Sequence, residues 1–297
     1  MEKNMEHEIA AINQQSFKDK IKSYTKHPCS FLLLLLVLVA AVLTVGVLVF
    51  LVGYILIRGI PYLKPSLFAW TYNSDNVSML PAMINTLFMT VLALLLSVPF
   101  GVGAAIYLVE YAKKGNKLVG IIRVTAETLS GIPSIIYGLF GMLFFVTALK
   151  WGYSMMAGAA TLAIMVLPVI MRTTEEALLC VPDSFREGSF GLGAGKLRTI
   201  FKIVLPSAIP GILSGIILAI GRIVGETAAL IYTSGTVANL AGFFDSGRTL
   251  AIHMYSLSRE GMHTNEAYAT AVVLLIVVLI INGVSSLIAK KFEAPKQ

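Results

Sequence analysis

The fold is decided by the stretch Ser207-Ala-Ile-Pro-Gly-Ile-Leu-Ser-Gly-Ile-Ile-Leu-Ala-Ile-Gly-Arg-Ile-Val-Gly-Glu-Thr-Ala-Ala-Leu230. It is apolar enough, and longer than the roughly 20 residues needed, to cross a lipid bilayer as a helix. It nevertheless contains Arg222 and Glu226. At a rise of about 1.5 Å per residue, these side chains would lie about 22 and 28 Å from the Ser207 end. Both charges are therefore expected inside the membrane.

The rest of the chain has the same apolar character. Of its 297 residues, 57% are hydrophobic and 13% are charged, whereas soluble domains carry about 25% charged residues. Seven stretches of at least 18 residues contain no charged side chain. Two of them flank Arg222 and Glu226, and the second is too polar to face lipid, so they are joined into one span. The sequence thus predicts an all-α polytopic membrane protein with six transmembrane helices, at approximately 31–57, 83–109, 131–149, 153–171, 207–230 and 267–289.

The distribution of basic residues sets the expected topology. With six spans, 17 of the 23 lysines and arginines fall on the side that holds both termini. Since basic residues concentrate in cytoplasmic segments, both termini are expected in the cytoplasm. We expect a cytoplasmic tail at 1–30, an anchor helix at 31–57 and a transmembrane domain at 80–290. Four acidic residues nearly offset the five lysines of the tail, which favours topological anchoring beside membrane lipid over nucleic-acid binding.

A glycine-rich segment in the long cytoplasmic loop does not fit nucleotide binding. Gly191-Leu-Gly-Ala-Gly-Lys196 has Phe190 and Leu197 where a phosphate-binding loop needs Gly and Ser or Thr. The chain also lacks a His, Cys and carboxylate cluster typical of a metal or nucleophilic site. It is therefore expected to bind no cofactor and to catalyse no reaction. Any ATP and Mg²⁺ belong to other subunits.

The same segment fits a different pattern. The sequence from Glu187 to Pro206 resembles the E-A-A-x3-G-x9-I-x-L-P loop of permease subunits of type I, MetI-like ABC importers. The matching positions are Glu187, Gly193, Ile203, Leu205 and Pro206, whereas Gly188 and Ser189 replace the two alanines. The resemblance implies that the loop at 172–206 docks on an ATPase subunit. The alternative is an ordinary loop with a glycine turn and a proline suited to begin the next helix.

The charged residues of the fifth span allow two interpretations. Arg222 and Glu226 are four residues apart, so in a continuous helix they share a face and can pair. One interpretation is a structural ion pair that makes the buried arginine tolerable. The other is that Arg222 lines a translocation path, where its planar guanidinium suits an oxyanion.

Two segments resemble phosphate-specific ABC importer permeases. They are Gly131-Ile-Pro-Ser-Ile-Ile-Tyr-Gly138 and Gly221-Arg-Ile-Val-Gly-Glu-Thr-Ala-Ala229. The length of the chain and the segment 249–255 are more similar to the PstA subunits than to their PstC partners. The resemblance implies a role in phosphate passage for Arg222, Glu226 and Thr227. It also implies alternating access in a complex with a PstC-like subunit, two PstB-like ATPases and an external PstS-like phosphate-binding protein.

Arg123 and Glu127 form a second i, i+4 pair before the third span. They can extend the path, gate its inner mouth or form an interfacial pair on an amphipathic helix. Two alternative functions also remain open at this stage. One is import of another oxyanion, sulfate or molybdate, and the other is ion-coupled secondary transport by the Arg222 and Glu226 pair.

Overall fold

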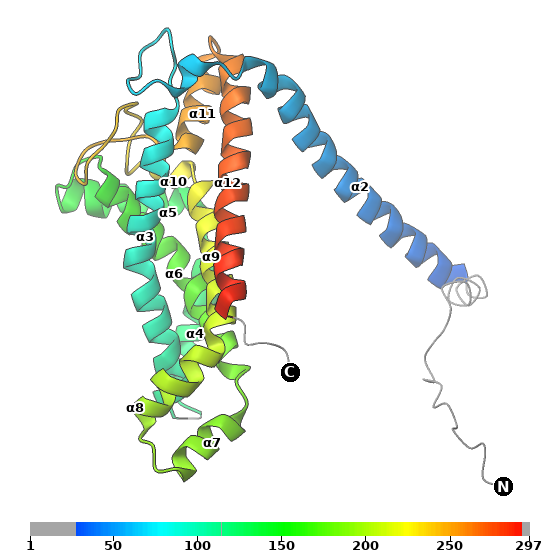
Figure 1. Ribbon diagram of the computed structural model, residues 1–297, viewed down its shortest axis with the longest axis vertical. Coiled ribbons are helices and arrows are strands. Elements are labelled where there is room, and N and C mark those ends of the chain that lie inside the picture. Colours follow the sequence, from blue (N-terminus) through cyan, green and yellow to red (C-terminus); the bar gives the residue numbers. More distant parts are fainter. Residues whose placement is uncertain (1–27, 114, 293–297) are drawn as a thin grey trace. The chain divides into compact units, whose positions relative to one another are not determined.

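The computed structural model describes residues 28–113 and 115–292, and every regular element in them is a helix (Figure 1). The first is α2 (Pro28–Gly59). Residues up to Ile55 form a unit separate from the chain that begins at Leu56. Within its own unit, α2 exposes its apolar side chains along its length, as expected for a helix surrounded by lipid. The prediction of an all-α membrane protein is confirmed.

The remaining unit is a bundle of long helices joined by short ones. Its elements are η1 (Ile60–Tyr62), η2 (Pro65–Phe68), α3 (Leu80–Ile106), η3 (Tyr107–Tyr111), α4 (Lys117–Ser130), α5 (Ser134–Gly141), η4 (Met142–Ala148), α6 (Met155–Leu179), α7 (Asp183–Gly191), α8 (Lys196–Thr199), η5 (Ile200–Val204), α9 (Leu205–Val224), α10 (Ala228–Ile231), α11 (Leu250–Glu260) and α12 (Thr264–Phe292).

Five of the described helices are long and apolar enough to cross a membrane. They are Cys29–Tyr62, Leu80–Tyr111, Met155–Leu179, Lys196–Val224 and Thr264–Lys291. A sixth candidate is the pair formed by α4 and the helix Ser134–Ala148, which bends by 100°. The expected third span, 131–149, is thus a shorter helix that turns sharply away from its amphipathic lead-in.

The expected fifth span, 207–230, has different bounds from the observed helix, which runs from Lys196 to Val224. It begins earlier because the π-helical turn η5 ends at Val204 and continues through Leu205 into Pro206. A wider turn accommodates the proline ring and the missing N–H. It ends earlier because the backbone stops being helical at Gly225. The expected path residues Glu226 and Thr227 therefore lie beyond the helix.

Helix α6 is the centre of the bundle and packs against both α3 and α9, which run beside it (Figure 1). Its side chains Leu162, Met165 and Ile170 are fully buried. Two glycines of α9 allow close approach to α6. A Cβ atom at Gly211 would lie 2.6 Å from the Cβ of Ala177, and one at Gly215 would collide with Thr173. Small residues on α9 therefore serve helix packing, as their spacing predicts.

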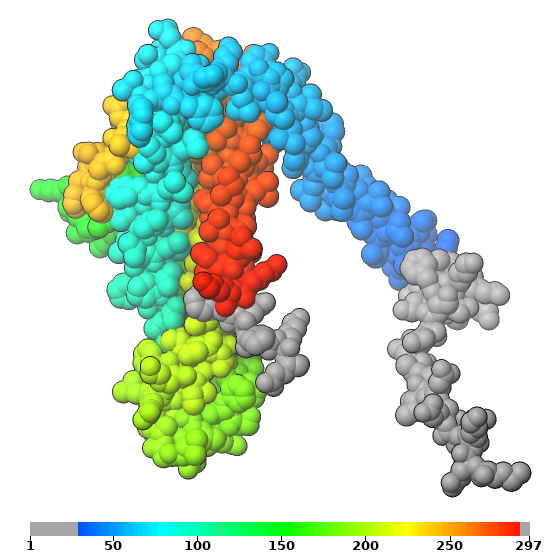
Figure 2. All heavy atoms as spheres, in the orientation of Figure 1, coloured from blue at the N-terminus to red at the C-terminus, as the bar shows by residue number. Residues whose placement is uncertain are grey.

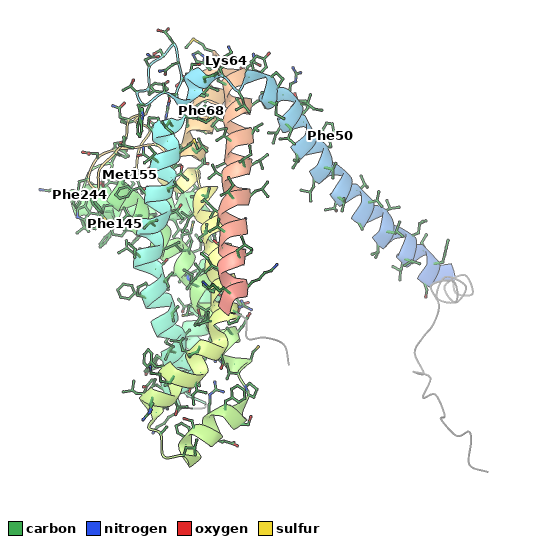
Figure 3. The ribbon with its side chains drawn as sticks, viewed as in Figure 1. Phe50, Lys64, Phe68, Phe145, Met155 and Phe244 are labelled. Atoms are coloured by element: carbon green, nitrogen blue, oxygen red, sulfur yellow. The ribbon has the colours of Figure 1, made fainter. Side chains whose placement is uncertain are left out.

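The two ends of the bundle differ in character. One end carries α7 and α8, and is called the α7 end here; the opposite end carries α11 and is called the α11 end (Figure 1). Beside the bundle, aromatic side chains gather around η4 (Figure 3). The Phe145 and Trp151 rings stack at 5.3 Å, and the Phe244 ring meets Trp151 edge-on at 6.2 Å. Trp151 is the amphipathic member of this group, and tryptophan is enriched at membrane interfaces.

Candidate functional site

The central site is a break in the helical backbone after α9. Arg222 lies in the last turn of α9, and Gly225 ends that helix. A cation is favoured at this position because the unsatisfied carbonyl groups of a helix C-terminus carry partial negative charge. The expected ion pair between Arg222 and Glu226 is not formed within the described residues. The i, i+4 geometry that such a pair needs is lost when the helix stops between the two side chains.

Glu226 has a different partner. Its Oε1 accepts a hydrogen bond from the backbone N–H of Ala229 at 3.0 Å, and the residue is 9% exposed. Thr227 lies between them, at the residue that precedes α10. Glu226 therefore stabilises the first turn of α10 and forms no ion pair with Arg222 in the described part of the chain.

The two segments that resemble phosphate permeases lie against each other. Helix α10 packs on α5, and a Cβ atom at Gly138 would lie 2.7 Å from the Cα of Ala229. The Tyr137 hydroxyl donates a hydrogen bond to the Leu129 carbonyl at 2.7 Å. Gly138 permits the close contact of α5 with α10, and the Tyr137 hydrogen bond connects α5 to α4 across the bend between these two helices. Arg222 belongs to the second of the two segments.

The guanidinium of Arg222 has no hydrogen bond or ion pair to any residue that the structure describes, and its side chain is partly exposed. Charged residues within membrane helices normally face the bundle interior or a water-filled path. A planar guanidinium can form two parallel hydrogen bonds with an oxyanion. The break after α9 therefore presents an available anion-binding group.

A second charged site lies between α4 and α6. The expected pair of Arg123 with Glu127 is wrong, because each residue pairs with a side chain of α6. Arg123 donates from Nε to the Glu175 carboxylate at 2.7 Å, and Arg172 lies 3.7 Å from the Glu127 carboxylate. Glu175 is nearly buried. These pairs connect α4 to α6 in place of the expected contact along α4.

This α4–α6 network borders a cavity of about 260 Å³. Its charged lining residues are Arg123, Glu127, Arg172, Glu175 and Glu176. With two arginines and three glutamates, the network does not favour an anion, and separating the helices would break its ion pairs. The sequence reading missed the three α6 residues as site residues, although Arg172 and Glu176 have i, i+4 spacing and form a pair at 3.3 Å.

The segment that resembles a coupling loop is more compact than expected. In place of a loop over 172–206, only residues 180–195 lie between the helices α6 and α8. Glu187, Gly188 and Ser189 belong to α7, whereas Ile203, Leu205 and Pro206 belong to the following helix. Gly193 has a φ of +82°, a left-handed conformation that favours glycine.

The same segment exposes a surface suited to a partner. A groove of about 510 Å³ is lined by residues that include Phe185, Gly188 and Leu192. The Leu192 side chain is 90% exposed, and Glu187 is also exposed. In Figure 2 the green to yellow-green residues of this segment form the lower extremity of the bundle. Exposed apolar side chains around a groove are typical of a protein interface.

A buried ion pair that the sequence analysis missed holds α7 in place. Arg186 Nη2 lies 2.8 Å from Glu110 Oε1 in η3, and the two side chains are 14% and 9% exposed. Arg186 also donates to the carbonyls of Leu178 and Val181 at 2.9 and 2.8 Å. Glu110 and Arg186 are 76 residues apart in the sequence, so no local spacing indicates the pair. It fixes α7 to the ends of α3 and α6.

At the α11 end, polar side chains are buried around an aromatic ring. The Arg248 guanidinium lies over the Tyr72 ring at 4.5 Å, and the His253 ring meets Tyr72 edge-on at 6.2 Å. His253 is 0% exposed. Its burial and then the charge of Arg248 lower the pKa of His253 to about 3, against a weaker opposite effect of the Val77 backbone. The imidazole is therefore neutral.

This pKa predicts a pH-dependent stability of the α11 end. Since the folded pKa of His253 is below the unfolded value of 6.5, its contribution is complete above pH 6.5 and is lost as the pH falls towards 3. We expect a loss of about 2 kcal/mol between pH 6.5 and 5. Thermal unfolding of the solubilised protein should show this loss, and His253→Phe, which keeps a ring beside Tyr72, should reduce it. An equal pH dependence in both proteins would contradict the assignment.

These features together define an integral-membrane protein of the permease class: apolar helices around a broken span, with an accessible arginine at the break and an exposed partner surface at one end. The family described as "Binding-protein-dependent transport system inner membrane component" matches residues 97–294. The chain belongs to this family.

Curated relatives agree with this assignment. The chain is 35% identical over 278 residues to the "Probable ABC transporter permease protein YqgI" of Bacillus subtilis (strain 168), covering 86% of this chain and 94% of the relative. It is 37% identical to "Phosphate transport system permease protein PstA 1" of Mycobacterium tuberculosis (strain ATCC 25618 / H37Rv), over 70% of this chain and 68% of that protein. The PstA protein of Yersinia pestis is also 37% identical, with 67% and 68% covered. The chain is thus a PstA-like ABC permease.

Solved structures support the fold alone. An inward-facing structure of the MetNI methionine ABC transporter matches with a TM-score of 0.57 at 20% identity, covering 72% of this chain and 94% of that chain. A bacterial alginate ABC transporter in complex with its pentasaccharide-bound periplasmic protein matches with a TM-score of 0.67 at 15% identity, covering 90% and 97%. The MetI-like fold expected from the sequence is confirmed.

Proposed function

We propose that the chain is the permease subunit of an ATP-driven importer that carries inorganic phosphate across the cytoplasmic membrane. The observation that carries the proposal is the Arg222 guanidinium, which lies at the helix break and has no acidic partner among the described residues. The two parallel hydrogen bonds of one bidentate guanidinium contact suit two phosphate oxygens. The names of the PstA relatives support phosphate as the anion.

The proposed complex divides the work among subunits. The α7 end and both termini face the cytoplasm. There a PstB-like ATPase docks in the groove at α7. Two such ATPases hold ATP and Mg²⁺, and this chain hydrolyses nothing itself. A PstC-like subunit completes the pore, and a PstS-like protein delivers phosphate to the α11 end. The exposed Leu192 and Phe185 side chains support the proposed ATPase contact.

The proposed mechanism is alternating access. Closure of the ATPases on ATP moves α7, and the buried contacts of Arg186 transmit the movement to α3 and α6. The ion pairs of the α4–α6 network hold the cytoplasmic mouth of the translocation path closed until α4 separates from α6. Glu226 and Thr227 keep α10 in place at the break, so Arg222 is presented at a fixed position. Weak binding at one arginine permits release, which a tight site would slow.

The function is tested with the purified complex in proteoliposomes. We expect the phosphate-loaded binding protein to stimulate ATP hydrolysis and phosphate uptake. Sulfate or molybdate supplied in place of phosphate should have little effect on ATP hydrolysis and should not be taken up. Equal transport of sulfate would contradict phosphate specificity. Uptake that continues without ATP but stops when the proton gradient is dissipated would instead identify an ion-coupled secondary transporter.

A further inference from the structure

A cavity at the α11 end has no role in the mechanism above. It has a volume of about 340 Å³ and lies between the end of α10, the segment that follows it and the second half of α11. Its lining residues are Ile231, Thr236, Tyr255, Ser256, Arg259 and Glu260. None of them belongs to the α4–α6 network, the α7 groove or the helix break.

Helix α11 holds one wall of this cavity in a fixed position. Its Leu250, Ile252 and Leu257 side chains are fully buried, and the helix packs against both α12 and α3. The wall residues Tyr255 and Arg259 are four residues apart, so they project from one face of the helix. The buried side chains hold the backbone of α11 in place, whereas the Tyr255 and Arg259 side chains are exposed, so both groups extend from a fixed helix into accessible space.

The chemistry of the lining suits a protonated tetrahedral oxyanion. Arg259 has no ion pair or hydrogen bond from its side chain to any residue within 28–113 and 115–292. Three hydroxyl groups, those of Thr236, Tyr255 and Ser256, are further donors. The only carboxylate in the lining is Glu260. Phosphate keeps a proton near neutral pH, so its O–H can donate a hydrogen bond to this carboxylate, whereas sulfate has no O–H to donate.

The cavity is also close to the break that holds Arg222. Ile231 ends α10 and lines the cavity, while the first residue of α10 follows Thr227 directly. Four residues of helix are about 6 Å long, so the cavity residue Ile231 is about one helical turn along the chain from the residues of the break. Helix α10 thus connects a residue of the cavity wall to the segment that begins with Arg222.

We propose that this cavity is the entry site for phosphate on this subunit, where Arg259 receives the anion before it passes to Arg222. The proposal rests on the function proposed above and adds a residue that determines delivery and selectivity. Arg259 and the hydroxyl groups hold the anion, and Glu260 accepts a hydrogen bond from the P–O–H group that phosphate has and sulfate lacks. A basic group in a concave site also raises the local concentration of an anion.

The test compares Arg259→Gln with Lys64→Gln in the reconstituted complex, using radioactive inorganic phosphate. Lys64 is an exposed lysine at the same end of the bundle and outside the cavity, so its replacement removes equal charge (Figure 3). We expect Arg259→Gln to lower the initial uptake rate about fivefold to tenfold, which corresponds to one weakened charged hydrogen bond. Lys64→Gln should change it less than twofold. Glu260→Gln should let sulfate compete at a severalfold lower concentration.

The outcomes separate this proposal from the proposed function. The unmodified complex can transport phosphate while Arg259→Gln and Lys64→Gln have the same initial uptake rate. In that case the proposed entry site is wrong, and the proposed function stands. If the unmodified complex transports no phosphate, the function itself fails. Should Arg259→Gln not assemble, the double variant Thr236→Val with Ser256→Ala replaces it, with a threefold loss of uptake expected. Normal phosphate uptake in this double variant, together with unchanged sulfate competition in Glu260→Gln, would overturn the proposed entry site.

Discussion

Replacing Arg222 with glutamine should lower phosphate uptake at least about 100-fold without preventing assembly of the complex. Two charged hydrogen bonds contribute about 3 kcal/mol together when each is worth about 1.5 kcal/mol, and each 1.36 kcal/mol is a factor of ten. Assembly should persist because no side chain in the described part of the chain depends on Arg222 for an ion pair. Uptake and co-purification of the subunits are the two measurements.

Two further variants sharpen this test. Arg222→Lys keeps the charge but loses the planar fork, so its uptake should lie between those of the glutamine variant and the unmodified protein. Glu226→Gln should act through α10, because its Oε1 accepts the Ala229 N–H and does not contact Arg222. Its amide oxygen can still accept this bond, so uptake should fall only moderately. Normal uptake in Arg222→Gln would show that the arginine is structural.

The membrane spans could be predicted because they depend on one local property. A helix in lipid must be long and nearly free of charge, and charge-free stretches are visible in the sequence. The end of the fifth span was missed because the continuous apolar pattern hides the backbone break at Gly225. Its start was missed because Pro206 suggests a helix boundary, while a π-helical turn lets the helix continue. Both errors come from backbone geometry that side-chain composition does not encode.

The candidate site was found in part for a similar reason. Arg222 stands out as a charge in an apolar span, so the sequence alone singles it out, and the structure places it at the end of α9. The partners of Arg123 and Glu127 could not, because the i, i+4 rule considers only one helix. Arg123 instead bonds Glu175, which is 52 residues away in the sequence. Such pairs depend on how α4 and α6 pack, which no local pattern determines.

The second large effect is expected at Arg186, where replacement by alanine should uncouple ATP hydrolysis from transport. Removing one partner of a buried ion pair costs about 3 to 5 kcal/mol, and Glu110 would be left 9% exposed without its partner. The Leu178 and Val181 carbonyls would also lose their donors. We therefore expect α7 to lose its attachment to α3 and α6. Thermal unfolding of the complex should shift downward, and the phosphate transported per ATP hydrolysed should fall severalfold.

The chain supplies a matched control for this prediction. Asp183 also pairs with Arg186, at 3.1 Å, but its side chain is 83% exposed. Exposed ion pairs contribute about 0 to 1 kcal/mol, so Asp183→Asn should leave both unfolding and coupling nearly unchanged. The effect of Glu110→Gln on unfolding and coupling should lie between those of the other two variants, because Arg186 keeps its hydrogen bonds to the Leu178 and Val181 carbonyls in that variant. If Asp183→Asn and Arg186→Ala had equal effects, the pair would act only through surface charge, and the movement of α7 would have to reach the membrane helices by another contact, such as that of Lys196 with the Tyr111 ring.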